Sequence, residues 1–118
     1  MELEHKLAAL GLVGKKARFY LAALELGDET VTRVARQAGI GRTTAYALFE
    51  KLLEEGLVTR MERGGRTHII AEDPDVLIRN LEDRQRSLND ILPELRAIYT
   101  RTHGTPRFRL YDGKEGIR

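Results

Sequence analysis

Apolar residues recur at helical spacing between Thr30 and Leu57, and they predict two helices joined by a tight turn. In the first half, one apolar stripe at i, i+3, i+4 and i+7 consists of Val31, Val34, Ala35 and Ala38. Gly39 interrupts this pattern, and glycine readily takes the left-handed conformation that ends a helix. A second helix is predicted from Arg42 to about Glu55, with a stripe formed by Ala45, Leu48, Phe49 and Leu52. Two helices joined in this way form a helix-turn-helix, which places its second helix in the DNA major groove.

Two further helices are predicted before this motif. The first carries leucines on one face and stops near Gly11, and the second follows Gly14 and stops near Gly27. The apolar positions of the two helices are Leu3, Leu7 and Leu10, then Ala17, Tyr20, Leu21 and Leu24. The second helix lacks a capping side chain, and Lys15 and Lys16 stand at its positive end. These lysines either remain in solvent or bind a phosphate.

The segment from Leu57 to Ala71 predicts a β-hairpin. Two short, partly alternating runs flank Gly64-Gly65, a pair favoured in tight hairpin turns. Three helices followed by a hairpin make a winged helix. The predicted wing carries three arginines against one acid, Glu62, and we expect those arginines to reach phosphates or the minor groove. A purely structural hairpin would need the glycines but not the arginines.

A long helix is predicted from about Val76 to Tyr99, after the start signal Asp73-Pro74-Asp75. Residues alternating in steps of four and three form a heptad seam, with Arg84 as its polar exception: Leu77, Leu81, Arg84, Leu88, Ile91, Leu95 and Ile98. We interpret the seam as a dimerisation coiled coil, the alternative being a helix that folds back on its own protomer. Pro93 should bend the helix.

The position of the charges along the chain, more than their total, supports binding to nucleic acid. The net charge is only +2, but between Thr30 and Phe49 there are three arginines and no acid. The chain has no cysteine, which fits a reducing compartment, and neither a signal peptide nor a membrane-spanning apolar run is apparent. We therefore expect a cytoplasmic protein that does not interact with membranes.

The sequence shows no candidate residues for enzyme catalysis. The three histidines, His5, His68 and His103, have no metal-ligand spacing, and there is no phosphate-binding loop or nucleophile motif. We predict no catalytic residue, no cofactor and no metal site.

The predicted organisation is a mainly α-helical chain with a small β-hairpin. Residues 1–72 form the winged helix, residues 73–103 the long dimerisation helix, and residues 104–118 a linker and a short strand, Arg107 to Tyr111. A lone strand leaves its backbone groups unpaired. Either it pairs with another chain or, as we favour, it begins a C-terminal domain of a longer protein.

The sequence resembles the TrmB-type transcriptional regulators in several pieces that occur in the same order. These pieces are LAALGL, ARFYLAALELG, VARQAGIGRTTAYALFEKLLEEGLV, ILPEL and PRFRLYDGKEGIR. The resemblance implies a dimer on operator DNA, protomers paired through the long helix, and an effector domain, often for a sugar, after residue 118. The sequence departs from the pattern of these regulators at Gly14-Lys15-Lys16, where they usually have a capping hydroxyl and an acid.

Residues and resemblance together predict sequence-specific recognition of double-stranded DNA by a homodimer. The expected contacts come from the helix-turn-helix and the wing: Arg33, Arg36, Arg42, Thr43, Thr44, Tyr46, Arg60, Arg63 and Arg66. In the recognition helix, Arg42 is expected to read guanine, and Tyr46 either reaches the DNA or is a partly buried aromatic. Two alternatives remain open: a winged helix used for protein–protein assembly through its long helix, and a small-molecule sensor acting through the dimer interface.

Overall fold

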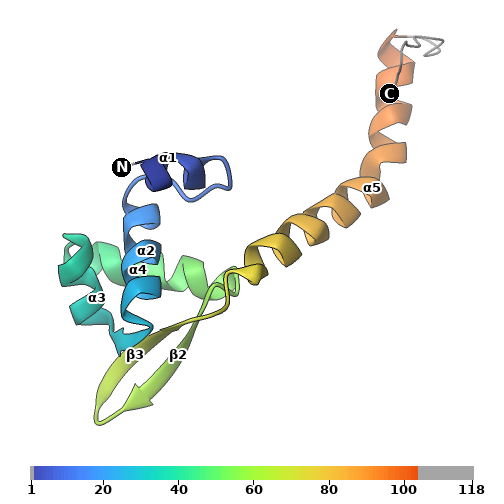
Figure 1. The fold of residues 1–118 in the computed structure, drawn as a ribbon. Coiled ribbons are helices and arrows are strands. Elements are labelled where there is room, and N and C mark those ends of the chain that lie inside the picture. The colour runs from blue at the N-terminus through green and yellow to red at the C-terminus, as the bar shows by residue number, and fades with distance from the viewer. Residues whose placement is uncertain (1, 104–118) are drawn as a thin grey trace. The chain divides into compact units, whose positions relative to one another are not determined.

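The computed structural model describes residues 2–103 (Figure 1). The strand and turn predicted at residues 107–113 lie outside this range. The chain divides into two units, Met1–Asn80 and a second that begins at Leu81. The elements, in chain order, are α1 (Glu2–Ala8), α2 (Lys15–Leu26), β1 (Asp28–Thr30), α3 (Val31–Ala38), α4 (Arg42–Glu54), β2 (Val58–Arg63), β3 (Arg66–Ala71) and α5 (Asp75–His103).

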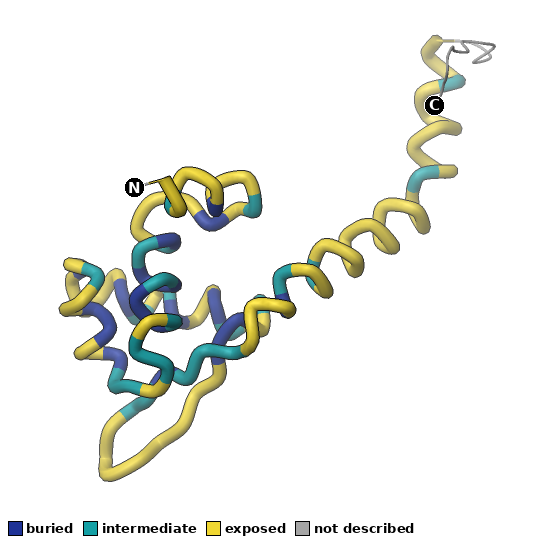
Figure 2. Tube along the Cα trace, viewed as in Figure 1, coloured by how far each residue is buried: buried dark blue, intermediate teal, exposed yellow. Residues whose placement is uncertain are grey.

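Helix α2 supplies much of the core of the first unit. Ala17 and Tyr20 of the predicted stripe are buried, and Phe19, Ala22 and Ala23 are buried as well, so the buried face is broader than the predicted stripe. Helices α3 and α4 supply most of the rest, with single buried residues from α1, β2, β3 and the start of α5, and Figure 2 shows many of the buried positions on α2, α3 and α4. Each helix therefore turns its apolar stripe inward, which leaves its polar side available for contacts outside the protomer.

The sheet has three antiparallel strands in the order β1-β3-β2, one strand more than the predicted hairpin. Strand β1 is the additional one, and it pairs Glu29 with Ile69 of β3. At the hairpin turn, Gly64 and Gly65 have φ angles of 59° and 74°. Positive φ at both positions belongs to the type I′ turn, whose twist matches the flanking strands. Strand β2 forms one outer edge of the sheet.

The start of α2 is uncapped, as predicted, because Gly14 makes no side-chain capping hydrogen bond. Lys16 is not the solvated side chain that one of the two expectations described. Its Nζ lies 2.6 Å from the Glu55 carboxylate at the end of α4, so it forms a partly buried ion pair. This pair links two helices of the core, while Lys15 remains exposed.

The first turns of α5 belong to the first unit. Val76 is buried, Leu77 packs against the core, and the Asn80 side-chain amide donates a hydrogen bond of 2.9 Å to the backbone carbonyl of Glu55. Leu77 therefore has contacts within its own protomer, unlike the rest of the predicted seam.

From Leu81 to His103, α5 belongs to the second unit and carries its apolar seam on the surface. The seam leucines and isoleucines are 46–51% exposed: Leu81, Leu88, Ile91, Leu95 and Ile98. The helix extends beyond Tyr99 to His103, the last described residue, and contains Pro93. It bends in its C-terminal half (Figure 1), the half that includes this proline, which removes one backbone hydrogen bond. Within residues 2–103, no helix is long and apolar enough to cross a membrane.

Candidate nucleic-acid interface

The turn between α3 and α4 has the geometry that the sequence predicts. Gly39 is left-handed, with φ 70° and ψ 40°, and its N–H donates to the carbonyl of Arg36 at 3.1 Å. The N–H of Ile40 donates to the carbonyl of Ala35 at 2.9 Å, which buries Ile40 beneath the turn. These bonds satisfy the last carbonyls of α3 and reverse the chain into α4.

The first turn of α4 presents backbone donors and a cation together. Gly41 makes no side-chain capping hydrogen bond, so the first N–H groups of the helix have no such partner. The Arg42 guanidinium lies 5.8 Å from the centre of the Tyr46 ring, and that ring meets Phe49 edge-on at 6.4 Å. Tyr46 is therefore half-buried, packed against the core and still at the surface of the helix. Such a helix start favours a phosphate or another anion.

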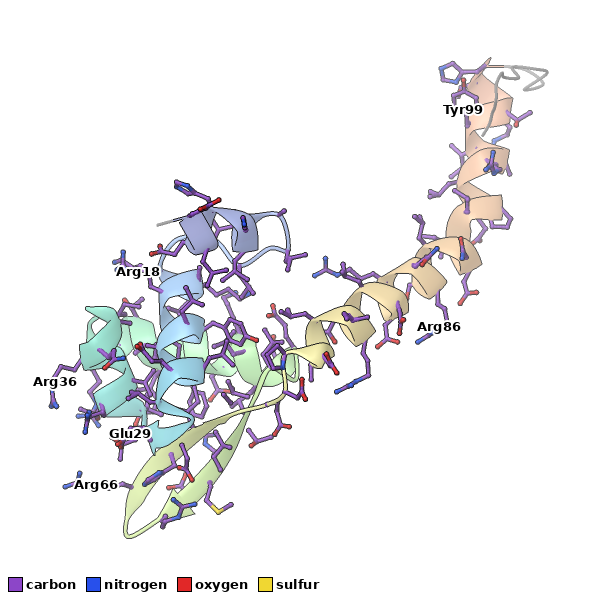
Figure 3. The ribbon with its side chains drawn as sticks, viewed as in Figure 1. Arg18, Glu29, Arg36, Arg66, Arg86 and Tyr99 are labelled. Atoms are coloured by element: carbon purple, nitrogen blue, oxygen red, sulfur yellow. The ribbon has the colours of Figure 1, made fainter. Side chains whose placement is uncertain are left out.

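A basic groove lies between the helix-turn-helix and the wing. Its volume is about 650 Å³, and its lining comes from four elements and the hairpin turn: Glu29, Thr30, Thr32, Arg33, Arg36, Arg42, Tyr46, Gly65, Arg66 and Thr67. Figure 3 shows Arg36 on α3 and Arg66 on the hairpin pointing outward on the same side, with Glu29 between them. Helix α3, the start of α4 and the wing thus together place four arginines on one surface.

The charge of this groove is predominantly positive. Glu29 is the one acid in its lining, and it accepts from the Thr30 N–H at 2.9 Å and lies 3.6 Å from Arg33. The remaining three arginines, Arg36, Arg42 and Arg66, form no salt bridge with any residue between 2 and 103. Cations gathered without internal partners attract an anionic ligand, above all one with regularly spaced charges.

Some predicted contact residues lie outside the groove. Thr43 and Thr44 are exposed on α4 but do not line the groove. Arg60 on β2 lies 3.5 Å from Glu50 and 3.7 Å from Glu62, with its guanidinium 5.2 Å from the Phe49 ring centre. The structure therefore gives Arg60 partners that join the wing to α4.

Arg63 is held by a cluster at the other edge of the sheet. Its guanidinium lies 3.2 Å from Asp28, and the Nδ1 atom of His68 lies 2.9 Å from the same carboxylate. The hydrogen bond from the His68 ring, supported by Arg63, lowers the pKa of the Asp28 carboxyl below its ordinary value of 3.8. Because Asp28 lies in β1 and both partners lie in the hairpin, the cluster fastens the wing to β1.

Acidification is expected to remove the stabilisation that this cluster provides. Since the folded pKa of Asp28 is lowered, its contribution is fully present above about pH 3.8 and is lost as the pH falls through the folded value. The difference in free energy of unfolding between the native chain and Asp28→Asn should be constant above this pH and shrink below it. Urea unfolding followed by circular dichroism from pH 7 to pH 3 measures the difference; one that grows on acidification would contradict the assignment.

Sequence reasoning missed the polar residues that complete the groove. Thr30 caps α3, since its hydroxyl accepts from the Arg33 N–H at 3.2 Å. A threonine directly before an apolar helical stripe is a capping signal, so this position was detectable. Glu29 and Thr67 carry no such local signal. They reach the groove only because β1 pairs with β3, which lies far away in the sequence.

Solved structures with the same fold are winged-helix regulators. A MarR-family transcriptional regulator from Silicibacter pomeroyi DSS has a TM-score of 0.54 and 20% identity, with 88% of this chain and 65% of that chain covered. TrmBL2, described as an archaeal chromatin protein with a novel mode of DNA binding, has a TM-score of 0.63 and 18% identity, with 88% and 40% covered. The organohalide-sensing regulator RdhR, bound to 2,4-dichlorophenol, has a TM-score of 0.53 and 18% identity, with 97% and 76% covered.

At these identities the likeness establishes the fold, and this chain spans 65% and 40% of the first two structures. No curated protein matches the sequence. The fold defines a protein of the winged-helix class. The profile of the family described as "sugar-specific transcriptional regulator TrmB" matches residues 7–75, more than half of the chain. The chain belongs to the TrmB family, as its sequence resemblance implied.

Proposed function

We propose that this chain recognises a specific operator in double-stranded DNA as a homodimer, with α4 in the major groove and the hairpin against the backbone. The observation that carries the proposal is the groove between α3, α4 and the wing, where four arginines face one acid. A duplex offers a phosphate charge about every 1.7 Å along its axis, and such a surface is complementary to it.

Within this proposal the residues have different tasks. Arg42, at the first position of α4, reads a base edge, because arginine donates two hydrogen bonds to guanine. Thr43 and Thr44 beside it contact a thymine methyl group or a phosphate, and Tyr46 supports Arg42 from within the same helix. Arg33, Arg36 and Arg66 bind phosphates and set the position of the helix. Arg60 and Arg63 reach DNA only by leaving the acids that hold them.

The exposed seam of α5 supports the homodimer. Five large apolar side chains at heptad spacing are about half exposed. Their contact with water does not stabilise an isolated protomer, and a contiguous exposed apolar surface of this kind marks an interaction site. A dimer covers this seam and presents two recognition helices, as a two-fold symmetric operator requires.

We also propose a small-molecule effector that binds outside the described residues. The family description names sugar-specific regulation, and one structural neighbour carries 2,4-dichlorophenol. We place a sugar-like effector in a domain that follows residue 118.

Replacing Arg42 by alanine should weaken operator binding by about 1–3 kcal/mol and relax the preference at one base pair. An operator is first selected from a random duplex pool, and fluorescence anisotropy then measures both chains on the operator and on variants at each position. Arg79→Ala removes an exposed arginine that is not in the groove, and it should leave the binding unchanged.

An equal loss on every sequence would mean that Arg42 contacts only the backbone. If the native chain bound no duplex at low salt, the winged helix would instead serve protein–protein assembly.

A further inference from the structure

The seam of α5 contains one polar position, and this position restricts how two copies can pair. In heptad letters, Leu81, Leu88 and Leu95 occupy a, while Arg84, Ile91 and Ile98 occupy d. All are exposed in the protomer, and Arg84 forms no salt bridge with residues 2–103. Pro93 falls at f, on the side away from the seam, so the proline does not interrupt the apolar face.

Parallel pairing in register would place each residue beside its own copy. The two Arg84 guanidinium groups would then meet at a d layer, between apolar layers that exclude water. Like charges brought together at such a position repel each other. Arg84 therefore opposes a parallel pair.

The aliphatic residues at the a and d positions of α5 also disfavour a parallel pair, independently of Arg84. Parallel two-stranded coiled coils favour β-branched residues at a and leucine at d, whereas leucine at a with isoleucine at d shifts the preference to higher oligomers. This helix has leucine at each of its three a positions and isoleucine at two d positions. In an antiparallel pair, a residues face d residues, so each apolar layer combines one leucine with one isoleucine.

We propose that two copies of this chain pair through α5 in antiparallel orientation, with Leu88 of each copy facing Ile91 of the other. In this register Leu81 faces Ile98 of the second copy, and Arg84 faces Leu95. The two Arg84 residues are then eleven positions apart along the pair, or about 16 Å at 1.5 Å per residue. This separation exceeds the screening length of about 8 Å at physiological salt.

The inference rests on the proposed homodimer and adds its orientation. In a parallel pair the two Leu81 residues would be neighbours. In the antiparallel pair they lie about 26 Å apart, at opposite ends of the seam. Each winged helix precedes Leu81 in the chain, so the orientation sets where the two DNA-binding units leave the helical pair.

Introduced cysteines distinguish the two orientations, because the natural chain has none. The full chain is prepared as Leu81→Cys and, with a size tag, as Ile98→Cys. Each variant alone and their refolded mixture are oxidised with diamide and separated on non-reducing gels. A disulfide needs Cα atoms about 4.4–6.8 Å apart. Antiparallel pairing should give a mixed 81–98 disulfide only in the mixture, and neither variant alone should cross-link.

Cross-linking of each variant by itself, with no mixed product, would overturn the antiparallel orientation and leave the dimer intact. A second pair, Arg84→Cys with Leu95→Cys, should repeat the mixed result if Leu81→Cys or Ile98→Cys weakens folding. Arg86→Cys, at an f position, is the control for collisional cross-linking.

Sedimentation equilibrium of the reduced samples separates this inference from the proposed function. A monomeric native chain without cross-links would reject both the orientation and the homodimer. Anisotropy with random duplex DNA on the same samples tests DNA binding independently of pairing.

Discussion

Leu88→Asp is expected to convert the homodimer into monomers and to lower operator affinity by about 10²–10⁴-fold. Each chain would bring a carboxylate into the middle of the seam in place of a leucine that is 49% exposed in the protomer. Burying an ionised carboxylate without a partner is far less favourable than burying a leucine, so the paired state is lost. The loss of affinity follows because linked binding to two half-sites exceeds single-site binding by about this factor.

Sedimentation equilibrium and anisotropy on the selected operator measure the two effects of Leu88→Asp. Asn89→Asp adds the same charge one residue further on, outside the seam, and should behave as the native chain does. If Leu88→Asp remained a dimer, the protomers would have to pair through another surface.

Raising the salt concentration from 50 to 200 mM should lower the affinity for DNA by about 10³-fold. The three phosphate-binding arginines of each protomer, Arg33, Arg36 and Arg66, give a dimer about six phosphate contacts, and the slope of log K against log salt is about −0.9 per contact. Arg66→Ala removes one contact from each protomer and should make this slope shallower by about two. Arg63→Ala should change it less, because Asp28 already neutralises Arg63 at 3.2 Å.

The same titration on random duplex DNA provides the control, since phosphate contacts do not depend on sequence. A flat salt response would exclude the groove as the binding surface. Equal effects of Arg63→Ala and Arg66→Ala would show that Arg63 leaves Asp28 when DNA binds.

Local patterns predicted the parts of the molecule that local chemistry determines. The helix-turn-helix was predictable because Val31, Val34 and Ala35 repeat at helical spacing and Gly39 supplies the left-handed turn. The hairpin followed from Gly64-Gly65, since few other residues adopt positive φ at both positions. The long helix was found for similar reasons, although its end at His103 lay beyond the last seam residue.

Contacts between distant residues could not be predicted in this way. Strand β1 is three residues long, Asp28–Thr30, and lacks apolar alternation; its strand conformation depends on β3, about forty residues later. The partners of Lys16 and Arg63 are 39 and 35 residues away, so the sequence showed only isolated charges. The sequence therefore predicted which arginines could meet DNA, and the tertiary structure separated those with acidic partners from those without.

The free edge of β2 has a consequence for molecules that gather on the same DNA. Regulators bound at neighbouring sites meet at high local concentration, where an open strand edge is a template for strands of other molecules. Here that edge carries Arg60, Glu62 and Arg63, which impede the close approach of another strand. Crowding on DNA would thus leave the wings separate, and neighbouring molecules would not fuse into an extended sheet.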